Sequence, residues 1–197
     1  MKRVLILIPT DRTIMSECWD SAINQDYPIC SVMVHVDKPV AGHKTMDSAM
    51  NRNAMRNMAL HSDADNFLLL DSDTVLPLDA VSRLISHNLD IVGGWYPFLN
   101  RPGMWVMAKR VGNCYNNFNY PVPGLSEVDT IGLGCMLISR KVYQTIEFNA
   151  GLLPGDEIEV NGLPGLRGIS ARWAHDAQKA GFKLFADGGV ICKHLPR

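Results

Sequence analysis

The sequence predicts an α/β fold in which a mainly parallel β-sheet is flanked by helices. Short apolar runs alternate with helix-type patterns through the first half of the 197-residue chain. This alternation is typical of parallel sheets that carry helices on both faces. A hydrophobic content of 47% supplies enough apolar residues for a core. The length suits one domain, which we expect to span residues 1–197.

The first half contains the most regular elements. Its apolar runs are rich in aliphatic residues and end at prolines or acidic residues, as buried strands do. The segments between them repeat apolar residues at helical spacing. We expect strands at 3–9, 30–36, 66–70 and 90–96, and helices at 13–25, 45–62 and 78–88.

The second half is less regular. Ser170 and Gly181 are suited to the start and end of a helix over 170–181. We expect further strands at 104–111, 127–140, 182–186 and 189–195, and a short helix at 141–146. Residues 112–124, rich in Asn, Tyr and Pro, predict a surface loop. Residues 149–168, rich in Gly with two prolines, predict a mobile loop.

Charge and cysteine content exclude several classes of protein. With 19 Lys and Arg against 20 Asp and Glu, the chain has no basic excess for binding nucleic acid. The five cysteines are scattered without a C-x-x-C pair, which favours a reducing compartment, and we expect the cytoplasm. The apolar run Val4 to Ile8 is too short for a signal peptide. No run reaches the roughly 20 apolar residues of a transmembrane segment.

Acidic residues follow three of the predicted strands. In "FLLLDSDTVLP", Asp71 and Asp73 are two residues apart, so their side chains point the same way on an extended chain and suit one divalent cation. The alternative is a turn or a helix cap, for which Asp is also favoured. Asp11 and Asp37 follow the first and second strands. Ligands of parallel sheets lie beyond the carboxyl ends of the strands, where all four carboxylates should meet.

Five segments, in order, resemble family 2 glycosyltransferases of GT-A fold, in particular the small phage- and virus-type members. They are "CWDSAINQDYP", "NRNAMRNMALHSDADNFLLLDSDTVLP", "DIVGGWYPFLNRPG", "GLGCMLISRKVY" and "AGFKLFADGGVICKHL". The resemblance covers nearly the whole chain. It implies transfer of a sugar from a nucleoside-diphosphate sugar to a carbohydrate or glycan hydroxyl, with Mn²⁺ or Mg²⁺. It also implies that residues 1–96 bind the donor, while residues 97–197 hold the acceptor and complete the metal site.

The resemblance assigns residues to three roles. The metal ligands are Asp71, Asp73 and His194. The donor-binding residues are Thr10, Asp11, Arg12, Asp37, Arg52, Asn53, Asp71, Ser72 and Asp73. The sugar and acceptor residues are Trp95, Tyr96, Gly132, Leu133 and Gly134. Asp37 suits uracil and guanine alike, so UDP and GDP both stay open. The aromatic pair is equally compatible with core packing, and the glycines with a bulge.

The catalytic base is where the chain departs from the pattern. Inverting family members carry an acidic pair at the start of the helix predicted at 170–181, where this chain has Ile169 and Ser170. Asp176 lies about 9 Å further along that helix. Three interpretations remain: Asp156 or Glu157 in the loop 149–168 is the base, the enzyme is retaining, or catalysis is impaired. We favour the loop carboxylates.

Two other functions compete with the transferase. A catalytically inactive nucleotide-sugar or glycan-binding module would explain the missing acidic pair. A nucleotidyltransferase would also combine a parallel sheet with acidic residues, but no glycine-rich basic loop follows the first strand.

Overall fold

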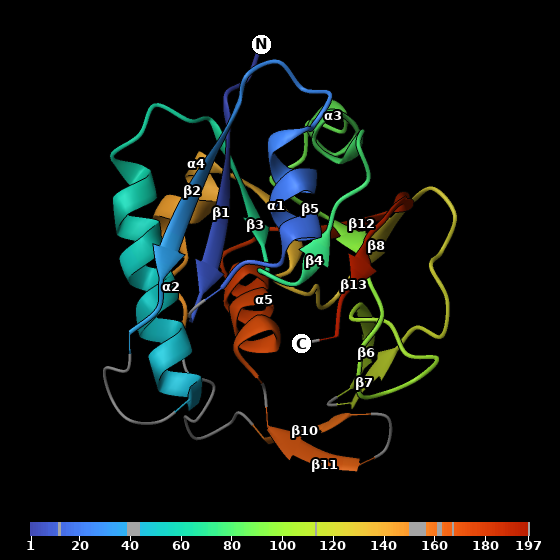
Figure 1. Cartoon of the computed structure of the whole chain (residues 1–197). Helices are drawn as coiled ribbons and strands as arrows, with labels where there is room; N and C mark the ends of the chain where they lie inside the picture. The colour runs from blue at the N-terminus through green and yellow to red at the C-terminus, as the bar shows by residue number, and fades with distance from the viewer. Residues whose placement is uncertain are drawn as a thin grey trace.

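The computed structural model describes residues 1–11, 13–38, 44–112, 114–149, 157–160, 163–166 and 168–196. Its centre is a seven-stranded sheet in the order β2-β1-β3-β9-β5-β12-β8 (Figure 1). The strands are β1 (Val4–Thr10), β2 (Cys30–Val36), β3 (Asn66–Leu70), β5 (Ile91–Trp95), β8 (Leu125–Val128), β9 (Cys135–Ser139) and β12 (Leu184–Ile191). Five of them run in one direction, and β8 and β9 run against them. The predicted α/β class with a mainly parallel sheet is confirmed.

Helices cover both faces of this sheet. They are α1 (Ser16–Ile23), α2 (Lys44–Leu60), α3 (Ala80–Ser86), α4 (Arg140–Thr145) and α5 (Ile169–Lys179). Helices α2 and α4 contact each other, and α3 packs on β5 and β12. In Figure 1, α1 lies in front of the sheet and α4 behind it. Coverage on both sides explains why every residue of β1, β3 and β5 is buried.

Aromatic side chains join the helices to the sheet. Phe148, which follows α4, stacks on Trp173 of α5 with ring centres 6.0 Å apart. Tyr143 of α4 packs against Phe67 of β3 at 4.7 Å. The Asn53 side chain forms two hydrogen bonds with the main chain of Phe148. Its Oδ1 accepts the Phe148 N–H at 2.8 Å, and its Nδ2 donates to the Phe148 carbonyl at 2.9 Å. These contacts fix α2, α4 and α5 relative to one another.

Two smaller sheets flank the main one. The four-stranded sheet β11-β10-β7-β6 consists of β6 (Ala108–Val111), β7 (Cys114–Asn117), β10 (Glu157–Val160) and β11 (Leu163–Leu166). Figure 1 shows β10 and β11 below α5, apart from the main sheet. The two-stranded sheet pairs β4 (Thr74–Val75) with β13 (Lys193–His194), which brings His194 opposite Thr74. Within the described ranges, every helix falls short of the length and apolarity that a bilayer crossing requires.

Several predicted boundaries were wrong. The strand predicted at 127–140 is two strands, β8 and β9, because the chain turns around the side chain of Tyr96 at Gly132 and Gly134. The expected loops 112–124 and 149–168 contain β7, β10 and β11. Strands β10 and β11 form a local antiparallel hairpin, whereas β10 pairs in parallel with β7 across a long sequence separation. The second of these pairings is tertiary and leaves no local pattern.

The last elements also differ from prediction. Helix α5 begins at Ile169 with Gly168 as its N-cap, so Ser170 lies inside the first turn. The two strands predicted at 182–186 and 189–195 form one longer strand, β12, with a register shift between Asp187 and Ile191, followed by β13. The Gly188-Gly189 pair interrupts the apolar pattern at the irregularity, and the strand continues through it.

Candidate active site

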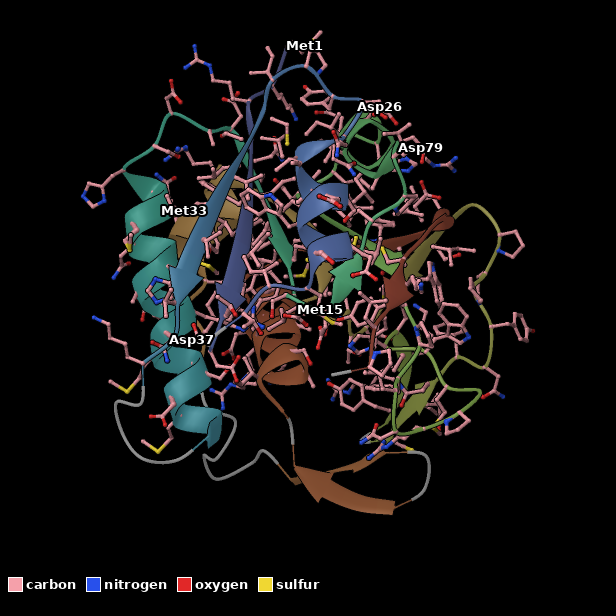
Figure 2. The ribbon with its side chains drawn as sticks, in the orientation of Figure 1. Met1, Met15, Asp26, Met33, Asp37 and Asp79 are labelled. Carbon is pink, nitrogen blue, oxygen red and sulfur yellow. The ribbon has the colours of Figure 1, made fainter. Side chains whose placement is uncertain are left out.

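The first three strands end at one edge of the sheet. Strand β1 pairs in parallel with β2 and with β3, so their carboxyl ends are aligned. The Asp37 N–H donates to the Thr10 carbonyl at 2.7 Å and ties two of these ends together. Figure 2 shows Asp37 at the arrowhead end of β2, whereas Asp26 and Asp79 lie toward the opposite end of the molecule. The predicted acidic edge therefore exists, with Asp11, Asp37 and Asp71 close enough to influence one another electrostatically.

Arg52 of α2 reaches this edge and binds Asp71. Its Nη2 lies 2.8 Å from Asp71 Oδ1, and the two side chains are 11% and 30% exposed. The other terminal nitrogen, Nη1, is buried and has no hydrogen-bond partner among the described residues. A buried guanidinium N–H without an acceptor is costly in a folded protein. A ligand that carries negative charge would satisfy it.

Asp37, like Arg52, has a buried polar atom without a hydrogen-bond partner among the described residues. This atom is its Oδ1. Burial raises the pKa of Asp37, and the positive charge of Arg52 partly opposes that rise. A carboxylate left in this state is suited to accept a hydrogen bond from a ligand N–H or O–H.

Asp73 and His194 form a second pair. His194 Nε2 lies 3.5 Å from Asp73 Oδ1, and the Leu195 N–H donates to the Asp73 carbonyl at 2.8 Å. His194 Nδ1 lies 2.9 Å from the carbonyl oxygen of Pro97. Since a carbonyl only accepts, Nδ1 carries a proton and Nε2 is the nitrogen presented to Asp73. The hydrogen bond with Asp73 raises the pKa of His194 against the opposing effect of burial.

This arrangement fits a divalent cation in its chemistry, although it is not a ready-made metal centre. A metal-binding histidine commonly donates its second N–H to a carbonyl, as His194 does to Pro97. A carboxylate with an imidazole suits Mn²⁺. Across the described ranges, however, no three His, Cys, Asp or Glu side chains are grouped closely enough to hold an ion. Asp71 is drawn toward Arg52, and Asp73 contacts His194 directly.

A cavity of about 460 Å³ opens beside these pairs. Charged and polar groups from α2, β3 and β13 lie on its wall together with apolar side chains from the second half of the chain. Its lining comprises Ser48, Arg52, Asp71, Tyr96, Phe98, Val106, Gly132, Leu133, Gly168, Ile169, Ser170 and His194. The cavity thus joins residues from both halves of the sequence at the acidic edge.

Tyr96 fills the space beside the two glycines of the 129–134 turn. A Cβ on Gly132 would lie 2.2 Å from the Tyr96 hydroxyl oxygen, and a Cβ on Gly134 would lie 2.8 Å from it. The Gly134 N–H donates to that hydroxyl at 2.8 Å. Burial, reinforced by the negative charge of Asp71, raises the pKa of Tyr96 well above its usual value. The glycines therefore seat a tyrosine of the chain itself, and the hydroxyl stays protonated.

Two of the predicted site residues have structural positions instead. Trp95 is fully buried and packs edge-on with Phe118 at 5.3 Å, because neighbouring residues of a strand point to opposite faces. Its expected stacking on a sugar is therefore wrong. Asn53 uses both ends of its side-chain amide on the Phe148 main chain and lies outside the described cavity wall, and its expected donor contact stays a prediction.

The start of α5 contributes to the cavity but provides no carboxylate. Ile169 and Ser170 lie on its wall, at the positions where the resemblance leads us to expect an acidic pair. Asp176 is held by Arg172 at 2.9 Å and by Asn149 at 3.2 Å. Glu157 is the first residue of β10. Arg12 and Asp156, with much of the 149–168 segment, lie outside the described residues.

Thr10 and Ser72, two further predicted donor-binding residues, are buried and lie outside the described cavity wall. The Thr10 hydroxyl donates to the carbonyl of Thr13 at 2.6 Å, and the Ser72 carbonyl accepts from the Met15 N–H at 3.0 Å. Sequence reasoning missed three cavity residues, Ser48, Phe98 and Val106. Ser48 precedes Arg52 by one helical turn and so shares its face of α2, which was a usable signal. The other two carry no local signal.

The fold is that of the GT-A glycosyltransferases, a mostly parallel sheet flanked by helices. Three solved structures share it. A197 from STIV has a TM-score of 0.69 at 18% identity, over 99% of this chain and 86% of that chain. GalNAc-T7, in a structure with UDP, GalNAc and Mn²⁺, has a TM-score of 0.62 at 9% identity, over 100% of this chain and 44% of its own. S. aureus TarS has a TM-score of 0.61 at 11% identity, over 98% and 37%.

The chain therefore spans less than half the length of the GalNAc-T7 and TarS chains. No protein-family model matches the sequence. No curated protein matches it either. Identities this low show a common fold, and the activity has to be argued from the site itself.

Proposed function

We propose that this chain is a metal-dependent glycosyltransferase that moves a sugar from a nucleoside-diphosphate sugar to an acceptor hydroxyl. One observation carries the proposal. Two buried polar atoms of opposite character, Asp37 Oδ1 and Arg52 Nη1, lack partners in the described residues at the ligand-binding edge of a GT-A fold. A nucleoside diphosphate offers N–H or O–H donors to the first and phosphate oxygens to the second.

In this proposal Asp37 binds the base or ribose of a UDP or GDP donor, while Arg52 and Asp71 lie near the diphosphate. Asp73 and His194, with Asp71 beside them, would hold Mn²⁺ or Mg²⁺. When bound, such a cation neutralises the charge that develops on the leaving diphosphate. GalNAc-T7, which shares the fold, has been crystallised with a nucleotide and Mn²⁺, and this supports the choice of ligand.

The proposed base is Glu157 or Asp156, brought to the acceptor hydroxyl when the segment 149–168 closes over the donor. Two features support this. Within the described part of the cavity wall, Asp71 is the single carboxylate, and Arg52 already engages it. Gly168, which borders the same segment, lies on the wall. A carboxylate from this segment would therefore enter next to the cavity.

A second candidate is an inactive nucleotide-sugar or glycan-binding module, favoured by Ile169 and Ser170 at the expected base positions. A single experiment separates the two. UDP-, GDP- and dTDP-sugars are screened for Mn²⁺-dependent thermal stabilisation, and the best ligand is then incubated with the protein. A transferase slowly releases nucleoside diphosphate even without acceptor. A binding module is stabilised without any release, and absence of stabilisation by every nucleotide contradicts both.

A further inference from the structure

Two oxygen atoms of complementary character converge on the inner wall of the cavity. The Tyr96 hydroxyl oxygen lies 2.8 Å, and Asp71 Oδ2 lies 2.9 Å, from the position that a Cβ on Gly134 would take. Both residues line the cavity. Tyr96 directly follows β5 and Asp71 directly follows β3, and the strand between these two, β9, begins just after Gly134.

The tyrosine contributes a hydrogen-bond donor. Its oxygen already accepts the Gly134 N–H at 2.8 Å, so the direction of the hydroxyl group is constrained. The hydroxyl proton has no acceptor among the described residues, although the side chain is only 4% exposed. A buried O–H group normally finds a partner.

The aspartate contributes an acceptor. Arg52 occupies Asp71 Oδ1 at 2.8 Å, which leaves Oδ2 on the side that faces Tyr96. No hydrogen bond joins the two side chains in the described structure. A group that satisfies both must accept from Tyr96 and donate to Asp71.

We propose that Tyr96 and Asp71 Oδ2 together bind one hydroxyl group of the transferred sugar. A sugar hydroxyl accepts one hydrogen bond and donates another, which matches this pair. A phosphate oxygen does not match it, because it cannot donate and the carboxylate repels its charge. Because Gly132 and Gly134 have no side chains, they leave room for the phenol ring of Tyr96 in the position from which it can bind this hydroxyl group. The inference rests on the proposed function and makes Tyr96 a specificity-determining residue for the sugar, separate from the nucleotide.

The test compares a sugar nucleotide with its own nucleotide, so that the nucleotide contacts cancel. Calorimetry with Mn²⁺ measures the affinities of UDP-glucose, UDP-N-acetylglucosamine and GDP-mannose, each beside free UDP or GDP. For the pair that the unaltered protein binds, Tyr96→Phe should weaken the sugar nucleotide by about 2- to 12-fold, the scale of one neutral hydrogen bond. Binding of the free nucleotide should not change.

Tyr143→Phe is the matched control. Tyr143 is also fully buried and its hydroxyl has no partner in the described structure, but it lies outside the cavity wall. This variant should change neither affinity. The Tyr96 variant leaves the Gly134 N–H without an acceptor, so its melting temperature is measured first and binding is compared where both variants are folded.

Two outcomes overturn the inference while leaving the proposed function in place. One is an unchanged sugar-nucleotide affinity in Tyr96→Phe. The other is an equal loss for the sugar nucleotide and the free nucleotide, which would place the hydroxyl against the phosphates. If the unaltered protein binds none of the nucleotides, the proposed function itself fails, and the inference fails with it.

Discussion

Two acidic side chains, Asp37 just after β2 and Asp187 within β12, have opposite environments in the fold. Asp187 Oδ2 lies 2.9 Å from His87 Nε2, and its Oδ1 accepts the Gly189 N–H at 2.8 Å with Arg83 at 3.6 Å. Burial alone would raise the pKa of Asp187, but these partners lower it below its usual value. Asp37 is left with a buried, unpartnered oxygen in the described structure and a raised pKa.

This difference separates a structural cluster from the proposed binding site. Arg83, His87 and Asp187 join α3, the residue after it, and β12, and each carboxylate oxygen has a partner. Near Asp37, Arg52 also has a polar atom without a hydrogen-bond partner in the described residues, its Nη1. An unpartnered carboxylate oxygen and an unpartnered guanidinium nitrogen at one edge of a parallel sheet are groups that a ligand can complete. The expected consequences for binding, catalysis and stability follow from the largest effect to the smallest.

The largest effect should follow loss of the carboxylate that faces His194. Asp73→Ala should abolish Mn²⁺-dependent binding of nucleoside diphosphate, a loss beyond the roughly 10- to 100-fold caused by removing a residue that merely supports a metal ligand. The fold should persist, because the bond from Leu195 goes to the Asp73 main chain. Calorimetry with and without Mn²⁺ measures the effect. Unchanged affinity would remove Asp73 from the metal site.

The next effect concerns catalysis and not binding. Glu157→Gln or Asp156→Asn should lower kcat by about 10²- to 10⁴-fold, the usual contribution of a positioned general base. Donor affinity should stay nearly constant, because neither residue belongs to the Asp37 and Arg52 group.

Steady-state kinetics on both single variants and on the double variant tests this. Full activity in all three would exclude the carboxylates of this segment as the base. The retaining mechanism would then be the better interpretation for an active enzyme, and NMR analysis of the product anomer would follow.

A smaller loss should result at the nucleoside end of the site. Asp37→Ala should weaken nucleoside diphosphate by about 1.5–3 kcal/mol, the scale of a hydrogen bond to a charged group. The dependence on Mn²⁺ should not change, because Asp37 follows a different strand from Asp73. A loss of metal dependence in this variant would instead make Asp37 a metal ligand.

The smallest effects are changes in stability, and the comparison predicts opposite signs. Asp187→Asn should lower the free energy of unfolding by about 1–3 kcal/mol, since it removes a carboxylate that three groups stabilise. Asp37→Asn should raise it slightly at neutral pH, because ionisation of a carboxyl with a raised pKa opposes folding. Urea unfolding of the two variants measures both.

The pH dependence gives the same comparison a second test. Because its folded-state pKa is lowered, Asp187 stabilises the protein above the unfolded pKa of about 3.9, and this stability is lost as the pH falls through the folded-state pKa. Acid unfolding should therefore be less steep in Asp187→Asn. Identical acid profiles for the variant and the unaltered chain would show that the cluster contributes no linked stability.

The first half of the fold could be predicted because β1, β3 and β5 are continuous apolar runs buried on both faces. Strand β3 occupies the predicted residues, and α2 differs from its prediction by one or two residues at each end. Asp71, Arg52 and His194 line one cavity; the resemblance had assigned Arg52 and His194 to this site, and the rule that ligands lie at the carboxyl ends of parallel strands had pointed to Asp71. The same reasoning could not separate Trp95 from Tyr96, because which of two neighbours faces a cavity depends on what packs against the strand.

The second half was harder for a physical reason. Phe98 and Val106 reach the cavity through the path of the chain between β5 and β6, and no periodic pattern records that path. The glycines at 132 and 134 were visible, yet their partner, the phenol of Tyr96, is 36 residues or more away in sequence. Contacts of this kind are set by the packed structure and not by local preference.

The position of β9 also determines when the sheet can form during synthesis. Strand β5 pairs with β9 on one side and β12 on the other, so in the described sheet it has no neighbour made before residue 135. A nascent chain that ends near residue 96 would contain β1, β2 and β3, with β3 exposed as an edge in addition to β2, and β5 without a partner. Such a fragment exposes strand edges that invite aggregation. We therefore expect residues 1–96 to fold only after the ribosome has delivered the second half of the chain, and to need shielding by chaperones until then.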